Sequence, residues 1–167
     1  SSPITVADLP KSLHSKAFHI APIAGEISYD VVKRLKNYGA CISIDPQGMT
    51  RRFDTNGNVT CSVQIDKHVL NLIDIYRSSL EEAVTLTGQS DLNSIIKTLH
   101  ELGPKIVIIT IGEKGSVLST SGSIFKVPIY TSANVVDPTG AGDAFIGALL
   151  TEYVAGKNLL WCACVGS

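Results

Sequence analysis

A turn of small residues leads into a strongly apolar segment in the run Val135-Val136-Asp137-Pro138-Thr139-Gly140-Ala141-Gly142-Asp143-Ala144-Phe145. After the turn, apolar side chains recur at the spacing of one helical face, at Phe145, Ala148, Leu149 and Tyr153. We therefore expect a β-like approach, a tight turn, and a core-packed helix whose N-terminus lies at residues 140–142.

Such a helix start favours an anion site. Its first backbone N–H groups have no partner within the helix, the helix dipole adds positive charge, and small side chains allow close approach. A carboxylate in the first turn, here Asp143, is often only a cap or a partner of the dipole. Beside a phosphate it could instead accept the proton of an attacking hydroxyl group. The residues alone leave both interpretations open.

The longer string, from Asp137 to Phe145 and on through residues 147–150, closely resembles the C-terminal signature of the ribokinase-like (PfkB) family of sugar and nucleoside kinases. The resemblance implies an ATP-dependent phosphotransferase. It casts Asp143 as the catalytic base, and it places the anion hole for the transferred phosphoryl group at Gly140, Ala141 and Gly142. It further implies that Asp137 and Thr139 bind a monovalent cation, such as K⁺, that orders the anion hole.

Composition limits the class of protein. The chain has 167 residues, of which 44% are apolar and 17% charged, as expected for one globular domain. A net charge of −1 gives no reason to expect binding to nucleic acid or to an acidic membrane, and no apolar run reaches membrane-spanning length. The four cysteines form no CxxC pair, which indicates a reducing, cytoplasmic setting.

The order of the predicted elements indicates an α/β fold. A strand at 17–23, a helix at 26–36 with Ser28 as N-cap, and a strand at 41–46 form a βαβ unit. Further elements are a strand at 70–76, helices at 80–86 and 91–102, a buried central strand at 105–111, and two strands at 116–119 and 124–127 that look antiparallel. We expect a ribokinase-like, mainly parallel sheet flanked by helices.

Polar residues follow the strand that ends near Asp45. In an open parallel sheet, ligands bind beyond the carboxyl ends of the strands. The segment 46–63 is either a solvated loop with an Asn-Gly turn or the edge of a site, and the family resemblance favours a site edge formed by Asp45, Gln47, Arg51 and Arg52.

Ser79 and Glu82 have the spacing of a capping box, which ordinarily means only a capped helix. The segment also resembles the family motif Asn-x-x-Glu, which helps to organise Mg²⁺ and the ATP phosphates. Glu82 matches the family glutamate, which would hold Mg²⁺ through water. Ser79 replaces the usual asparagine at a nucleotide-binding position.

A glycine-containing turn follows the predicted central strand. It matches the nucleotide-binding turn of the family, which makes Thr110, Gly112, Glu113 and Gly115 candidate nucleotide ligands. The ordinary interpretation is a strand-to-hairpin turn, since glycine allows a sharp reversal.

The resemblance covers residues from about 17 to 167 and only the C-terminal part of the family fold, so we expect residues 1–167 to be the C-terminal part of a kinase domain. The N-terminal substrate and lid portion and the last elements would lie outside it, and residues 1–167 alone would be inactive. The expected acceptor is a sugar or cyclitol, with a nucleoside as the alternative. The expected partner is this small molecule, and a homodimer is allowed. A non-catalytic nucleotide-binding module is the rival class. A Rossmann dehydrogenase is disfavoured because no early GxGxxG is present.

Overall fold

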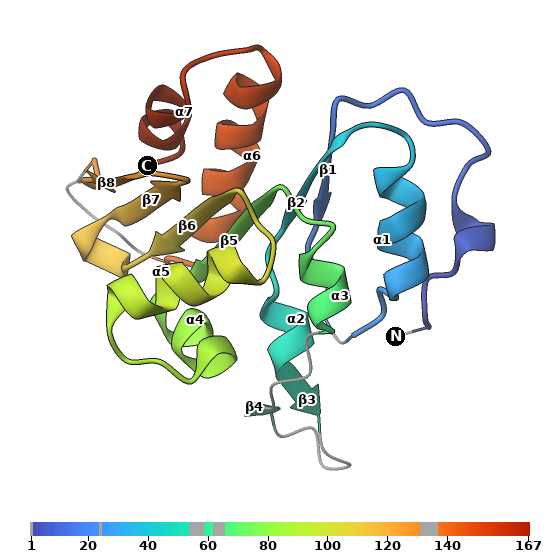
Figure 1. Ribbon diagram of the computed structural model, residues 1–167, viewed down its shortest axis with the longest axis horizontal. Helices are drawn as coiled ribbons and strands as arrows, with labels where there is room; N and C mark the ends of the chain where they lie inside the picture. The colour runs from blue at the N-terminus through green and yellow to red at the C-terminus, as the bar shows by residue number, and fades with distance from the viewer. Residues whose placement is uncertain (1, 24, 54–58, 62–65, 131–136) are drawn as a thin grey trace.

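The computed structural model spans residues 1–167 and describes all of them except residues 1, 24, 54–58, 62–65 and 131–136 (Figure 1). Its main feature is a six-stranded sheet in the order β1-β2-β5-β6-β7-β8. The first four strands in this order are parallel, and the last two are antiparallel to their neighbours. These strands are β1 (Ala17–Ile20), β2 (Cys41–Ile44), β5 (Ile75–Ser79), β6 (Ile106–Thr110), β7 (Ser116–Thr120) and β8 (Ser123–Val127).

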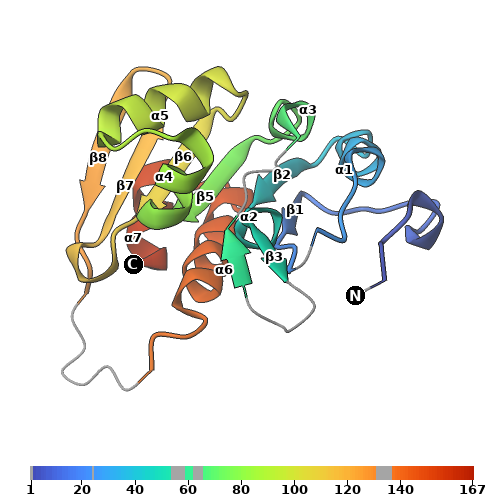
Figure 2. The same ribbon diagram turned by 90° about the horizontal axis from the view of Figure 1, so that it is seen from below.

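Helices cover both faces of this sheet (Figure 2). On one face lie α1 (Tyr29–Lys36), α3 (Lys67–Leu70), α4 (Leu80–Thr87) and α5 (Leu92–Glu101). On the other lie α6 (Ala141–Val154) and α7 (Leu159–Gly166). The predicted α/β fold with a mainly parallel sheet is therefore confirmed.

Burial on both faces explains why the sequence of strand β6 is apolar almost without interruption. Val107 and Ile109 belong to the core beneath α1, α3, α4 and α5, whereas Ile106 and Ile108 belong to the core beneath α6 and α7. Successive side chains of a strand point to opposite faces, and both faces are covered here, so no position favours a polar residue until Thr110.

Side-chain caps fix where several helices begin. The Ser28 hydroxyl accepts a hydrogen bond from the Val31 N–H (3.5 Å), and the Asp91 carboxylate accepts one from the Ser94 N–H (2.9 Å). Helix α4 ends at Gly88, which has the left-handed φ of 68°. The predicted cap at Ser28 is confirmed.

The strand predicted at 70–76 is wrong in its position. Asp66 accepts a hydrogen bond from the His68 N–H (2.8 Å) and caps the single helical turn α3, which buries Leu70. Strand β5 begins only at Ile75, opposite Ser43 of β2. Arg77, Ser78 and Ser79, expected to follow the strand, are therefore part of it.

The segment 46–63, expected to be either a solvated loop or the edge of a site, contains regular structure. It holds the short helix α2 (Gln47–Thr50) and an antiparallel pair formed by β3 (Arg51–Phe53) and β4 (Val59–Cys61). The expected Asn-Gly turn at residues 56 and 57 lies outside the described residues. Two single-turn 3₁₀ helices, η1 (Val6–Asp8) and η2 (Gly112–Lys114), complete the elements of the described residues. No helix in the described part of the chain is long and apolar enough to cross a bilayer.

Candidate active site

The N-terminus of α6 lies at the carboxyl ends of β5 and β6. Gly140 adopts a left-handed conformation (φ +80°), which favours glycine, and turns the chain into the helix. The Ala141 N–H donates to the Pro138 carbonyl (3.1 Å), and the Ala144 N–H donates to the Gly140 carbonyl (2.9 Å). Between Ala141 and Ala144 in the chain, Gly142 and Asp143 have their N–H groups at the positive end of the helix dipole. The predicted helix start is confirmed, and one of the three predicted anion-binding N–H groups, that of Ala141, already donates within the turn.

Asp137 shapes the turn before α6. Its Oδ1 accepts a hydrogen bond from the Thr139 N–H (2.9 Å). That backbone N–H, and secondarily the Thr139 side chain, lowers the pKa of Asp137 below its ordinary value. The two residues predicted to bind a monovalent cation are thus adjacent, with the carboxylate kept in its charged form.

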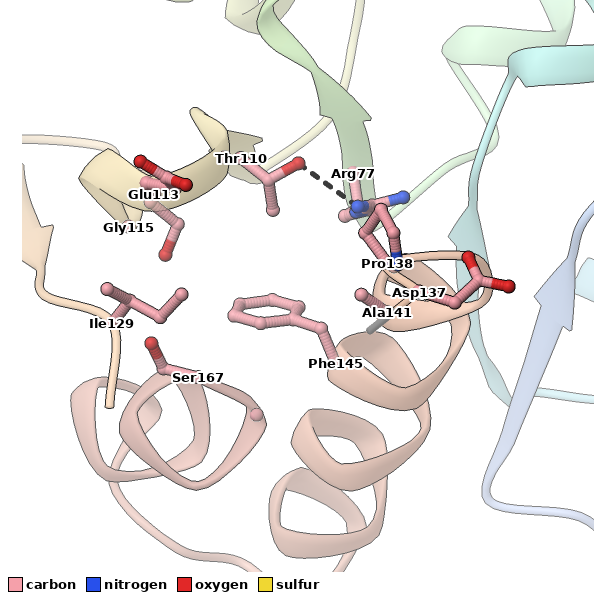
Figure 3. Close-up of a pocket in the computed structure, with 14 residues that line it drawn as sticks. Arg77, Thr110, Glu113, Gly115, Ile129, Asp137, Pro138, Ala141, Phe145 and Ser167 are labelled. Atoms are coloured by element: carbon pink, nitrogen blue, oxygen red, sulfur yellow. Dashed lines mark hydrogen bonds between the residues drawn. The ribbon is translucent and has the colours of Figure 1, made fainter. Parts of the chain in front are cut away.

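A cavity of about 510 Å³ opens beside this turn (Figure 3). The predicted nucleotide-binding residues Thr110, Gly112, Glu113 and Gly115 line one side of it, and Ala141 and Gly142 line another. Figure 3 shows the Phe145 ring between these two sides, with Ile129 and Ser167 facing it. The structure therefore brings the two predicted motifs to one cavity, although 25 residues of sequence separate Gly115 from Gly140.

Gly115 is required in this cavity for a steric reason. It adopts a left-handed φ of +83°, and a Cβ atom there would overlap the Val127 carbonyl oxygen and lie 3.1 Å from the backbone of Pro128 and of Ile129. The chain after β8 therefore passes directly against the turn after β6.

Ser79 and Glu82 do not line the cavity. They form the capping box of α4: the Ser79 hydroxyl accepts from the Glu82 N–H (3.2 Å), and Glu82 Oε2 accepts from the Ser79 N–H (2.9 Å). The ordinary interpretation of this spacing is confirmed, and the box stands at the end of β5, one strand from Thr110.

Arg77 is a site residue that the sequence analysis missed. Its Nη1 is ion-paired with Asp45 Oδ2, and its Nη2 donates to the Thr110 hydroxyl (3.0 Å). Its guanidinium lies against Gly142, where a Cβ atom would be 2.6 Å from the guanidinium carbon. Figure 3 shows Arg77 above the first turn of α6, with the hydrogen bond to Thr110 dashed.

Asp45 is the buried partner in this arrangement, with 1% of the residue exposed. Burial raises the pKa of its carboxyl group, and the neighbouring Arg77 guanidinium opposes that shift. One oxygen also accepts the Gln47 N–H (3.3 Å). Asp45 therefore orients Arg77 from beneath, and Gln47 lies next to it in α2.

Asp143 is a predicted site residue that stands apart from the cavity lining. It is exposed in the first turn of α6 and does not line the cavity. Its charge affects His19 in β1. Desolvation lowers the pKa of His19, whereas the carboxylates of Asp45 and Asp143 oppose that change. The cavity extends toward β6 and β7, and Asp143 toward β1.

The backbone of Arg51 and Arg52 belongs to β3, but their side chains lie outside the described part of the structure. Among the described residues, no cluster of three or more His, Cys, Asp or Glu side chains could hold a metal ion.

Arg77 could be assigned to the site only once the pairing register of β5 and β6 was known. Thr110 ends β6, and Arg77 lies two residues before the end of β5, with Arg77 paired to Ile108 and Ser79 to Thr110. The side chains of Arg77 and Thr110 therefore meet on the α6 face of the sheet. A strand placed at 70–76 excludes Arg77 from that edge, and the prediction missed it for this reason.

Comparison with known proteins identifies the family of the chain. Residues 33–167 match the family described as pfkB family carbohydrate kinase. The chain is 33% identical over 159 residues to a cytidine kinase of Thermococcus kodakarensis, covering 92% of this chain and 53% of that protein. It is 27% identical to an inositol 3-kinase of Arabidopsis thaliana, covering 99% of this chain and 44% of that protein.

Solved structures give the same result. A pyrophosphate-dependent kinase of the ribokinase family, complexed with a pyrophosphate analog and myo-inositol, superposes with a TM-score of 0.87 at 25% identity, covering 99% of this chain and 60% of that chain. Arabidopsis thaliana ribokinase complexed with ribose and ATP superposes with a TM-score of 0.73 at 29% identity, covering 89% and 46%. The chain spans about half the length of these relatives. With the ribokinase fold and the matching motif together, the chain belongs to the pfkB family of carbohydrate kinases.

Proposed function

We propose that the protein transfers the γ-phosphoryl group of ATP to a hydroxyl of a small sugar or cyclitol. One observation carries this proposal: the N-terminus of α6 borders the cavity that the glycine turn after β6 also lines, and its first turn carries an exposed carboxylate, Asp143, that does not line that cavity. A donor in the cavity and an acceptor beside Asp143 would meet at this helix terminus.

Asp143 is the proposed general base. The acceptor oxygen forms a bond to the terminal phosphorus of ATP while its proton passes to a carboxylate oxygen of Asp143. The bond between that phosphorus and the bridging oxygen breaks, and ADP leaves. Because Asp143 is exposed in the first helical turn, an acceptor hydroxyl has access to it.

The N–H groups at residues 140–142 are proposed to stabilise the charge that spreads over the transferred oxygens. Such fixed dipoles need no reorganisation during the reaction. The Ala141 N–H, which donates to Pro138, would have to be shared or released, whereas that of Gly142 lies in the open first turn.

Glu82 is proposed to hold Mg²⁺ through water. Glu82 Oε2 is engaged in the cap of α4, and no acidic cluster accompanies it among the described residues. A lone carboxylate suits an ion that keeps several waters and takes its other ligands from phosphates. Bound there, Mg²⁺ would neutralise charge on the donor phosphates. Asp137 and Thr139 are proposed for a monovalent cation, such as K⁺.

The acceptor class remains a choice between two chemistries. The inositol 3-kinase relative supports a cyclitol, and the cytidine kinase relative supports a nucleoside as the alternative. The chain spans about half of each, so we propose that residues 1–167 are the C-terminal part of the kinase domain and that the acceptor is selected largely outside them.

Inorganic pyrophosphate is a second candidate donor. The observation that favours it is Arg77, which adds a guanidinium to the phosphate end of the cavity next to Gly142. The solved relative with the TM-score of 0.87 is itself described as pyrophosphate-dependent.

The test is a transfer assay with the complete protein. It is incubated with Mg²⁺, γ-³²P-labelled ATP or ³²P-labelled pyrophosphate, and a panel of sugars, inositols and nucleosides. Label on one acceptor class, from one donor, identifies the reaction. Donor binding without label on any acceptor would favour the non-catalytic nucleotide-binding module.

A further inference from the structure

Arg77 has a role in the site that its ion pair with Asp45 does not account for. Only 11% of the side chain is exposed, and it lines the cavity. Nη1 pairs with Asp45 and Nη2 donates to Thr110, but the buried Nε has no hydrogen-bond partner among the described residues. A buried N–H without a partner is costly, and here it belongs to a side chain that faces a cavity.

The electrostatics of this position favour an anion. The guanidinium lies against Gly142, in the first turn of α6, where the helix dipole is positive. A cation at that end of a helix is unfavourable unless negative charge lies close to both. Asp45 lies on the side away from the cavity and offsets part of this charge, and a phosphate in the cavity would offset the rest.

A purely structural role explains less of the geometry. A counter-charge for buried Asp45 needs only the contact with Nη1. It does not require the second bond to Thr110, which turns the guanidinium plane, or a glycine at position 142, which lets the guanidinium reach the helix terminus. Planar, held guanidinium groups are suited to bidentate contacts with phosphate.

We propose that Arg77 binds the terminal phosphate of the phosphoryl donor and sets the affinity for it, with Asp45 and Thr110 holding its orientation. This inference rests on the proposed function and deepens it. The shared chemistry is a terminal phosphate, from ATP or from pyrophosphate, that would contact the guanidinium from the cavity that Arg77 and Gly142 both line.

The experiment compares Arg77→Ala and Arg77→Lys with the wild type in the complete protein, using ATP and pyrophosphate in separate arms. Lys97→Ala is the matched control, because Lys97 is an exposed cation on α5 with 78% of its side chain accessible. We expect the donor KM of Arg77→Ala to rise on the order of 10- to 100-fold, the scale of a lost charge-assisted bond. The acceptor KM should stay unchanged, and Arg77→Lys should lie between.

A second readout separates binding from architecture. Added guanidinium ion should restore part of the donor affinity of Arg77→Ala. Because that variant leaves Asp45 buried and unpaired, an Arg77→Met/Asp45→Asn double variant removes both charges and keeps the fold testable. It should unfold like the wild type but bind the donor as weakly as Arg77→Ala.

The outcomes are distinct. An unchanged donor KM in folded Arg77 variants would overturn the inference and leave the kinase intact. A larger loss with pyrophosphate than with ATP would identify the donor to which Arg77 matters most. If the wild type transfers phosphate to no acceptor, the proposed function fails, and calorimetric titration of pyrophosphate into wild type and Arg77→Ala still decides whether Arg77 binds it.

Discussion

At Gly142, a Cβ atom would lie 2.6 Å from the guanidinium carbon of Arg77 and closer still to its terminal nitrogens. Real carbon atoms do not approach that closely, so the residue type at this position depends on a side chain 65 residues earlier in the chain. Gly147, on the same helix, has no atom within 4 Å of its Cβ position. A methyl group at the first position would therefore force Arg77 to move, whereas at the second it would meet nothing.

We predict opposite effects for alanine at these two glycines. Gly142→Ala should displace Arg77 and raise the donor KM roughly tenfold, as expected for loss of one interaction with a charged group. Gly147→Ala should leave KM unchanged and stabilise the protein by about 0.5–1 kcal/mol, the usual gain inside a helix. Steady-state kinetics and urea unfolding measure both. Equal donor KM values for the two variants would contradict the account of Gly142.

The thiol of Cys41 provides a test of burial through pH. Burial, with a smaller contribution from Asp74, raises the pKa of this thiol from 9.0 to about 11. The thiolate is the reactive form, so a raised pKa means slower alkylation at neutral and mildly alkaline pH. We predict that the iodoacetamide rate at Cys41 reaches its midpoint near pH 11. Peptide mapping by mass spectrometry isolates the Cys41 signal, and a midpoint at or below pH 9 would contradict the prediction.

Among the elements, α4 begins at a capping box that could serve stability, metal binding or both. Ser79→Ala removes the acceptor for the Glu82 N–H, and it should lower the free energy of unfolding by about 1 kcal/mol. Glu82→Gln keeps an acceptor for the Ser79 N–H but removes the charge, so it should unfold nearly like the wild type.

The same pair separates the two roles of Glu82. We expect Glu82→Gln to require more Mg²⁺ for half-maximal activity, and Ser79→Ala to leave the Mg²⁺ requirement unchanged. Chemical unfolding and Mg²⁺ titrations give the two quantities. A Glu82→Gln variant with normal Mg²⁺ dependence would limit Glu82 to the cap.

Where the signal was local, the sequence was sufficient to predict elements. The apolar run at 105–111 predicted a central strand because both faces of β6 are covered, and the glycine turn predicted the start of α6 because backbone geometry is set there by nearby residues. Apolar residues such as Leu70 and Ile73 are equally compatible with a strand and with a short buried helical segment. For this reason the strand was wrongly placed at 70–76. Arg77 was missed as a consequence, since its partners Asp45, Thr110 and Gly142 are distant in sequence and meet only through strand register.

For the molecule as a whole, the two sides of the α6 N-terminus differ in how complete they are. The cavity is lined by residues of this chain from β5, β6, η2, α6 and α7, among others. Asp143 lies instead toward β1, which forms one edge of the six-stranded sheet. We therefore expect the chain to contain the donor side of the reaction and only part of the acceptor side.

This asymmetry predicts that residues 1–167 alone bind a phosphoryl donor but turn over slowly. The kcat/KM for the acceptor should fall by on the order of 10² or more relative to the complete protein, because positioning of the acceptor is lost. Pyrophosphate binding, followed by calorimetry, should change far less. Acceptor turnover by residues 1–167 at the rate of the complete protein would contradict this division.

The central claim is that Asp143 accepts the proton of the acceptor hydroxyl, and the most direct measurement is acceptor-dependent ADP release by the complete protein carrying Asp143→Asn. Asparagine keeps the size of the side chain but cannot accept the proton. The account predicts that kcat falls by a factor on the order of 10² or more while ATP binding and the midpoint of unfolding stay close to those of the wild type. A folded Asp143→Asn variant that releases ADP at nearly the wild-type rate would contradict it.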